Sequence, residues 1–296
     1  MEKQEALAKR GPSSLSNARP AWTVGLLEET LLREFPERDA EEWDRTGLVV
    51  GERACPVAKV AFALDPTVSA IREAAAQGAN VLVTHHPPFL SAPDSFAPEN
   101  SVAQSPGAGV YAAIREGVAL MCFHTALDVS PAAARVLPGM LGLSFTGKVI
   151  EPARTDTGEG VKGYGQLSDV RFGEEPVTLA TLAARVTAVF GRQPRVWGDF
   201  DRVVRRAVTA TGSAGGCGRA ALAAGVDCLI CGEVKYHEAL DLSEAGLAII
   251  ELGHDVSELP LVALLVRTAL AAGLDEDRVV VIDQASNWRL PEAIRL

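Results

Sequence analysis

Long apolar runs are missing from this 296-residue sequence. The longest candidate, residues 259–274, is interrupted by Arg267 and falls short of the roughly 18–20 apolar residues that a membrane span needs. Basic residues are outnumbered, since 38 Asp and Glu against 28 Lys and Arg give a formal net charge of −10. A nucleic-acid-binding surface needs positive charge to displace counterions from phosphates. We therefore expect no membrane and no nucleic acid among the partners of this protein.

Cysteine is scarce, and its five residues cannot form the even disulfide framework of a small secreted protein. Cys228 and Cys231 have CxxC spacing, but they lie in an apolar, strand-like run whose alternation would place them on opposite faces. The N-terminus also lacks the apolar core of a signal peptide. The cysteine pattern therefore predicts reduced, buried thiols in a cytoplasmic protein.

Strand-like and helix-like apolar runs alternate along most of the chain, and 48% of the residues are hydrophobic. Residues 59–64, 68–78 and 81–84 read as strand, helix and strand, and a crossover of this length predicts a parallel strand pair. Alternation of the same kind returns between residues 203 and 252. The predicted fold class is α/β.

Composition divides the chain into three segments. Residues 1–22 are charged and then rich in Ser, Pro and Asn, which predicts a disordered tail. Residues 23–145 form a first α/β lobe that contains the His-His-Pro motif. A shift toward Gly, Thr, Lys and Glu after residue 145 marks the boundary of a second α/β part, residues 146–296, which contributes a Gly-Ser-Ala-Gly turn and a Gly-His-xxx-Glu motif.

Two adjacent histidines, His85 and His86, follow the strand-like run at residues 81–84 and precede Pro87 and Pro88. Neighbouring strand residues point to opposite faces, so a continuing strand would keep the two imidazoles apart. Proline lacks the N–H that a strand ladder needs, so the strand ends here and both rings can turn toward one site. Histidine is the commonest metal ligand. The competing interpretation is a strand end with one hydrogen-bonded and one solvated histidine.

Every histidine of the chain follows a predicted strand, and two carboxylates lie in similar places. These residues are His85, His86, His124, His237, His254, Asp128 and Glu258. A mixed imidazole and carboxylate set suits zinc, iron, manganese or nickel better than calcium, which prefers oxygen ligands. The alternative for Glu258 is an acid in the first turn that stabilises the helix dipole, worth roughly 0.3–1 kcal/mol.

The start of the last long helix depends on Pro260, because proline fits only the first turn. We predict that Ser257 caps this helix, that Glu258 is its first residue and that His254 belongs to the preceding loop.

Residues 212–216, Gly-Ser-Ala-Gly-Gly, could present backbone N–H groups to an anion or phosphate. A tight strand-to-helix turn is the competing interpretation. The segment matches neither a P-loop nor a dinucleotide fingerprint, and no GxSxG elbow of a serine hydrolase is present.

Seven short motifs occur in the order of a known family. They are Trp43-Asp44…Gly47-Leu48…Gly51, Ala63-Leu64-Asp65, Thr84-His85-His86-Pro87, His124-Thr125…Leu127-Asp128, Gly212-Ser213-Ala214-Gly215, Gly232-Glu233…His237 and Gly253-His254…Ser257-Glu258. On these motifs the chain resembles the GTP cyclohydrolase 1 type 2 homologues, the NGG-one-interacting-factor-three-like proteins with a dinuclear metal centre. The resemblance covers nearly the whole chain after residue 23.

The resemblance implies a two-lobed α/β subunit that assembles as a homohexamer and holds two divalent metal ions in a cleft between the lobes. It implies that His85 and His254 hold one metal, that His86 and Asp128 hold the other, and that Glu258 bridges both. His124, Glu233 and His237 would lie nearby as catalytic candidates for proton transfer or for orienting the ligands.

Four positions depart from the family pattern: Arg45, Pro88, Ala126 and Asp255 stand where Asn, Leu, Asn and an aromatic residue are usual. No implied ligand is lost. Substrate contacts and ligand orientation are what these changes put in question.

We consider three functions. A two-metal site can turn water into a nucleophile at neutral pH, which predicts a metal-dependent hydrolase that acts on a nucleotide or another phosphate-containing small molecule, as the family name implies for GTP. The alternative is a non-catalytic metal-binding regulator, carrier or scaffold. A weaker alternative is a two-metal phosphoesterase.

Overall fold

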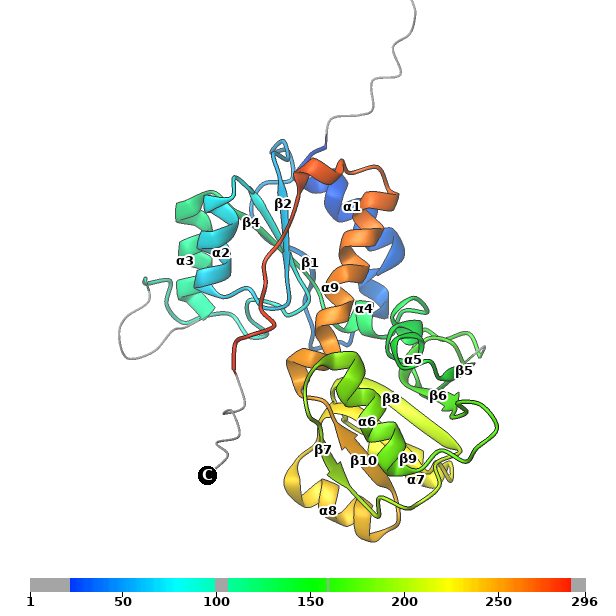
Figure 1. Cartoon of the computed structure of the whole chain (residues 1–296). Coiled ribbons are helices and arrows are strands. Elements are labelled where there is room, and N and C mark those ends of the chain that lie inside the picture. Colours follow the sequence, from blue (N-terminus) through cyan, green and yellow to red (C-terminus); the bar gives the residue numbers. More distant parts are fainter. Residues whose placement is uncertain (1–21, 99–105, 159, 289–296) are drawn as a thin grey trace, which may run out of the picture.

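The computed structural model of the protein describes residues 22–98, 106–158 and 160–288. Within these ranges the strands form two sheets, each of which lies between helices, and the two resulting lobes are stacked one above the other in Figure 1. The α/β fold class is therefore confirmed. The predicted disordered tail lies, apart from Trp22, outside the described residues.

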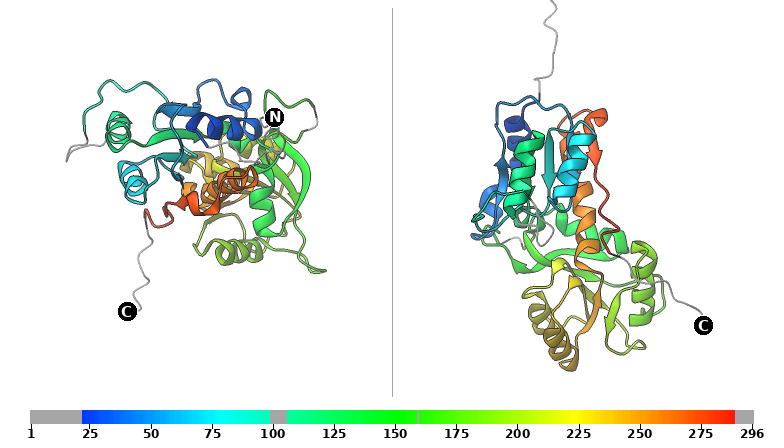
Figure 2. Two further views of the ribbon diagram at one scale, coloured as in Figure 1. Left: turned by 90° about the horizontal axis from the view of Figure 1, so that it is seen from above. Right: turned by 90° about the vertical axis from the view of Figure 1, so that its left-hand side faces the viewer.

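The first sheet has the strand order β1-β4-β3-β2-β11. Its strands are β1 (Thr46–Val50), β4 (Ala119–Phe123), β3 (Val81–Thr84), β2 (Val60–Ala63) and β11 (Val279–Val281). One face packs against α1 (Val24–Glu34) and α9 (His254–Ala271). The opposite face packs against α2 (Val68–Ala76) and α3 (Pro106–Glu116), which lie side by side in the right-hand view of Figure 2.

Strands β2, β3 and β4 run parallel, as the β–α–β pattern predicts, with Thr84 opposite both Ala63 and Cys122. Their last residues are buried on both faces, because helices cover each side of the sheet. The segments that follow these three strands therefore leave the sheet at one edge, and they carry Asp65, His85 and His124.

The second sheet has the order β5-β6-β8-β9-β10-β7. Its strands are β5 (Ser144–Pro152), β6 (Gly163–Asp169), β8 (Arg206–Ser213), β9 (Cys228–Glu233), β10 (Ala248–Glu251) and β7 (Arg195–Trp197). Helix α6 (Leu179–Phe190) covers one face, and α7 (Cys217–Ala223) and α8 (Tyr236–Glu244) cover the other. Cys228 and Cys231 belong to the cores on opposite faces, which confirms the alternation predicted for the CxxC pair.

Two parts of the chain bear on the predicted division at residue 145. The Gly-rich segment after it includes most of β5, which pairs antiparallel with β6, and its polar residues lie in the connection of these two strands. The C-terminal strand β11 does not stay with the second sheet. It pairs parallel to β2, since the β-branched residues Val279–Val281 complete the open edge of the first sheet.

Helix α9 begins four residues earlier than predicted, at His254, and accommodates Pro260 inside its second turn. The prediction that Pro260 lies in the first turn was wrong, because proline removes one N–H donor and the helix continues past it. The helix begins after Gly253, at φ 103°, and Ser257 Oγ donates to the carbonyl of His254. As a result His254 and Glu258 share one face of a helix. The helix then runs from the second lobe into the first (Figure 1), where Leu261 and Leu265 are fully buried.

No helix in the described ranges is both long enough and apolar enough to cross a membrane.

Candidate metal centre

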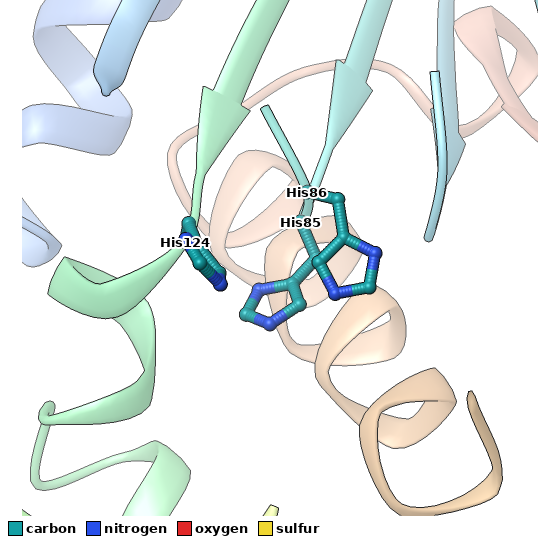
Figure 3. Close-up of side chains that lie close together, drawn as sticks. All are labelled: His85, His86 and His124. Atoms are coloured by element: carbon teal, nitrogen blue, oxygen red, sulfur yellow. The ribbon is translucent and has the colours of Figure 1, made fainter. Parts of the chain in front are cut away.

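The end of β3 turns sharply at the two histidines. Thr84 Oγ1 donates to the carbonyl of His86 at 2.6 Å, and the chain passes into Pro87. The ring centroids of His85 and His86 lie 5.0 Å apart, and the ring of His124, from the end of β4, lies 5.2 Å from that of His85 (Figure 3). The strand end therefore brings adjacent histidines to one place.

Glu258 lies at the middle of the cluster and is 3% exposed. Its Oε2 is 3.0 Å from Nε2 of His86 and 3.1 Å from Nε2 of His254. Its Oε1 is 3.6 Å from Nε2 of His85, which lies 3.7 Å from Oδ1 of Asp128. The one carboxylate thus faces two groups of side chains, one on each oxygen.

Among the residues that the structure describes, three sets of side chains have ligand atoms close enough to share an ion: His86, His254 and Glu258; His85, Asp128 and Glu258; and His85, His86 and His124. All five implied metal ligands are therefore together. The pairing differs from the one that the resemblance implied, because His86 lies with His254, and His85 lies with Asp128. The difference follows from the turn after β3, which buries His85 completely beside Asp128 and leaves His86 facing α9.

Each histidine of the cluster is held by an acceptor at Nδ1. The acceptors are the Phe123 carbonyl for His85 at 3.0 Å, Asp65 for His86 at 2.7 Å, Asp44 for His124 at 2.9 Å and Glu233 for His254 at 3.0 Å. A carbonyl cannot donate, so Nδ1 of His85 carries the proton and its Nε2 is a free lone pair in the neutral ring. Outer acceptors of this kind orient metal-binding imidazoles.

The buried carboxylates of the cluster favour positive charge beside them. Burial raises the pKa of the Asp128 carboxyl. Burial lowers the pKa of His85, but the adjacent Asp128 and Glu258 carboxylates outweigh burial and raise it. For His86, Asp65 and Glu258 outweigh burial in the same way and raise the pKa to about 10, and Glu258 raises that of His254 to about 9.

Two buried atoms of the cluster, Nε2 of His85 and Oε2 of Glu258, make no hydrogen bond of good geometry, although the Nε2 atoms of His86 and His254 lie 3.0 and 3.1 Å from that oxygen. Leaving such atoms unpaired costs roughly 1–3 kcal/mol each, and more when the group is charged. A divalent cation in each of the two groups would satisfy both atoms and neutralise the carboxylates. The donor set and its orphaned atoms therefore fit metal ions.

A cavity of about 600 Å³ opens beside the cluster and is lined from both lobes. Asp128 and Glu258 lie at one side of it, and Trp43, Glu151 and Tyr164 contribute other parts of its wall. A second, smaller cavity of about 380 Å³ reaches His86 and His254 from another side. Its wall includes Asp65, Glu233 and Trp288.

The glycine turn at residues 212–216 supports the cluster rather than presenting an open anion cradle. Gly212 has φ 58°, and a Cβ there would lie 2.1 Å from Oε1 of Glu258. Its N–H donates to Ser257 Oγ at 2.8 Å. At the far end of the turn, the Glu151 carboxylate lies against Gly216 and accepts from Cys217 Sγ. A carboxylate in that position disfavours a phosphate, so the interpretation of a tight turn fits better.

The three catalytic candidates are placed differently. His124 belongs to a ligand group and lines the larger cavity. Glu233 holds His254 and lines the smaller one. His237 is exposed on α8, where its ring contacts that of Tyr236, and belongs to none of the ligand groups in the described ranges.

The departures from the family pattern lie around the ligands. Ala126 is buried in the first core, and Arg45 is exposed. Asp255 binds the guanidinium of Arg192 at 3.2 Å. Pro88 is half-buried after the second histidine.

Asp65 stands in the sequence at the end of the Ala63-Leu64-Asp65 motif, which gave it no role. The signal was available, because Asp65 follows a strand parallel to the one that delivers His86. Asp44 was part of a motif, but its contact with His124 spans 80 residues and no local pattern predicts it.

Comparison with known proteins places these features in a family. The family model described as Duf34/NIF3 (NGG1p interacting factor 3) matches residues 23–287. The GTP cyclohydrolase 1 type 2 homolog of Streptomyces coelicolor is 32% identical over 231 residues, which span 76% of this chain and 78% of that protein. The protein of the same name from Clostridium acetobutylicum is 29% identical over 227 residues, 76% of this chain and 81% of that one.

Solved structures share the fold. A hypothetical protein of Staphylococcus aureus superposes with a TM-score of 0.75 at 23% identity, over 91% of this chain and 99% of that one. A Bacillus cereus protein related to NIF3 gives a TM-score of 0.74 at 19% identity, over 88% of this chain and 96% of that one.

Proposed function

Because this chain belongs to the Duf34/NIF3 family, we propose that it holds two divalent metal ions and is a metal-dependent hydrolase that acts on a nucleotide-like substrate. The observation that carries the proposal is the arrangement around Glu258. One buried carboxylate offers an oxygen to each of two ligand groups, and both groups contain an imidazole nitrogen directed at it.

The metal ligands are His86, His254 and Glu258 for one ion and His85, Asp128 and Glu258 for the other. Imidazole and carboxylate together suit zinc, iron, manganese or nickel. Ions of this class act as Lewis acids that polarise a substrate oxygen and lower the pKa of water.

The residues of the chain supply orientation and proton transfer. Asp44 fixes the ring of His124 through Nδ1. The His124 side chain lines the cavity and is 18% exposed, so its Nε2 can exchange a proton with a substrate. Glu233 acts on His254, whose orientation it sets. His237 has no part in the proposal because it is exposed on α8.

A nucleotide-sized ligand suits the larger cavity, whose volume of about 600 Å³ lies within the range of small-molecule sites. The described lining contains Glu41, Asp128, Glu151 and Glu258 but no Lys or Arg. Phosphate groups would therefore be attracted to the cations and repelled elsewhere. Hydrolysis of a nucleobase ring, as the name of the relatives suggests, is the specific reaction that we propose to test.

The test uses purified protein loaded with manganese or zinc and supplied with GTP, with formate and phosphate measured as products. We expect His86→Ala to abolish turnover, because it removes a ligand, and the matched His237→Ala to retain it. Equal turnover in wild type and His86→Ala would rule out this metal centre as the source. Release of phosphate without formate would identify a phosphoesterase instead.

A second function, a non-catalytic metal carrier, regulator or scaffold, is favoured by one observation. The His85, Asp128 and Glu258 group is buried throughout, as in a site closed by protein ligands. Tight metal binding without turnover of any nucleotide or phosphate ester would support it.

We also propose, from the resemblance, that the chain assembles as a homohexamer. Native mass spectrometry of the purified protein measures this directly.

A further inference from the structure

The residues after β11 form a C-terminal strap, residues 282–288, that contacts Asp65 in the first lobe and Arg192 in the second. Ile282 donates its N–H to the carbonyl of Phe62 at 2.9 Å, which starts the strap along β2. Figure 1 shows this segment, in red, descending past the sheet toward the junction of the lobes. Nothing in the proposed function uses it.

Gln284 fixes the backbone from which His86 is held. Its Oε1 accepts the N–H groups of Leu64 and Asp65 at 2.8 and 2.9 Å, and its Nε2 donates to the Asp65 carbonyl at 3.1 Å. The side chain is 5% exposed, so these bonds are shielded from water. Because two donors face one end of the amide and a carbonyl faces the other, its orientation is determined.

Two further bonds connect this backbone to His86. The N–H of His86 donates to the Leu64 carbonyl at 2.9 Å, and its Nδ1 donates to the Asp65 carboxylate at 2.7 Å. Gln284 therefore acts on the His86 ring in two ways, through the backbone of Leu64 that holds the His86 N–H and through the Asp65 side chain that holds Nδ1. The sequence separation between Gln284 and Asp65 is 219 residues, so only the fold establishes this link.

The other end of the strap lies against the segment that carries His254. Arg192 donates to the Ala285 carbonyl at 3.1 Å, stacks 4.0 Å from the ring centre of Trp288 and binds Asp255, the neighbour of His254. A Cβ on Gly253 would lie 3.3 Å from the Trp288 ring. The strap thus contacts both segments that deliver the imidazoles of one ligand group.

We propose that Gln284 is a positioning residue for the His86 and His254 half of the metal centre, acting through Asp65. The other half, His85 and Asp128, has a different support, because Thr211 Oγ1 donates to Asp128 at 3.1 Å. The two halves therefore respond to different substitutions. The proposal rests on the metal binding in the proposed function but not on hydrolysis.

The experiment measures cobalt(II) affinity at both sites of the full chain, by absorption spectroscopy in competition with a chelator. His86→Ala and Asp128→Asn identify the signal of each site. Gln284→Leu leaves the two N–H groups unpaired, and we expect it to weaken only the His86 site, by about tenfold, the low end of the effect of losing an outer partner. Gln284→Glu retains the acceptor for the two N–H groups but sets a carboxylate oxygen against the Asp65 carbonyl, so it is expected to recover only part of the affinity.

Thr211→Val is the reciprocal control, expected to weaken only the Asp128 site. The proposal is overturned if Gln284→Leu weakens the cobalt(II) affinity of both sites equally or changes neither. A lowered melting temperature in that variant would then identify a purely structural role. Wild-type protein that binds no cobalt(II) would refute the proposed function itself. Two bound ions in wild type without turnover would leave the positioning role intact.

Discussion

Replacing Glu251 by Gln tests how the second lobe holds the segment beside the cluster. Glu251 is 5% exposed at the end of β10, directly opposite Arg195 of β7. Its Oε1 accepts from the Val234 N–H at 3.0 Å and from Arg195, and its Oε2 accepts from Trp197 Nε1 at 3.0 Å and from Arg195. Val234 follows Glu233, the residue that holds a ligand histidine.

The magnitude follows from the donors that a Gln cannot satisfy. Glutamine keeps one oxygen and turns an NH2 group toward the other pair of donors, so either the Val234 N–H or the Trp197 N–H loses its acceptor. A buried donor without a partner costs roughly 1–3 kcal/mol. The Arg195 side chain is 58% exposed, so its lost pairing adds only about 0–1 kcal/mol. We expect a loss of about 1–4 kcal/mol in the free energy of unfolding.

The pH dependence has a definite sign. Burial raises the pKa of Glu251, but the hydrogen bonds from Arg195, Trp197 and Val234 outweigh it and hold the pKa below its ordinary value of 4.5. A carboxyl with a depressed folded pKa contributes stability that is present above its unfolded pKa and is lost as the pH falls through the folded value. The gap between wild type and Glu251→Gln should therefore be full at neutral pH and narrow below about pH 4.5.

Urea unfolding of metal-free protein, at neutral pH and at the lowest pH where the wild type folds, measures both effects. Glu42→Gln is the matched control, because Glu42 pairs with Arg154 with both side chains exposed and should lose at most about 0.5 kcal/mol. The reasoning is refuted if Glu251→Gln loses no more than the control. It is also refuted if the gap stays constant as the pH falls.

Three further predictions concern the cluster and the thiols. Gly212→Ala would place a methyl group 2.1 Å from Oε1 of Glu258 and should reduce metal affinity at both sites. Gly215→Ala is also at positive φ but has open space around it, so it should cost only backbone strain. Equal metal affinities of the two variants in a titration would contradict this. Ser257→Ala removes the acceptor of the buried Gly212 N–H and should lower the free energy of unfolding by roughly 1–3 kcal/mol, and a loss below about 0.5 kcal/mol in a urea titration would show that this bond is replaced. A thiol reagent should label Cys55 rapidly in the folded protein, because Cys55 is exposed and burial raises the pKa of the other four thiols. Rapid labelling of two or more cysteines would contradict the described burial.

The sequence by itself determined the kinds of element and which imidazoles and carboxylates to consider as ligands. The apolar run before His85 predicts a strand, and its place after a helix predicts parallel pairing with β2, because short-range periodicity depends on the backbone alone. His86 and Asp128 were predicted as ligands from short motifs, since a metal site needs particular side-chain types whatever lies around them, and the structure places both in groups that could hold an ion.

Only the tertiary structure decided which candidate ligands lie together and what holds them. The early start of α9 gave Glu258 and His254 a common face, and the burial of His85 placed it with Asp128. The return of the C-terminal segment brought Gln284 to Asp65. Contacts of this kind join residues far apart in the chain, and their geometry is fixed by the packing of complete helices and sheets, which no local pattern of residues contains.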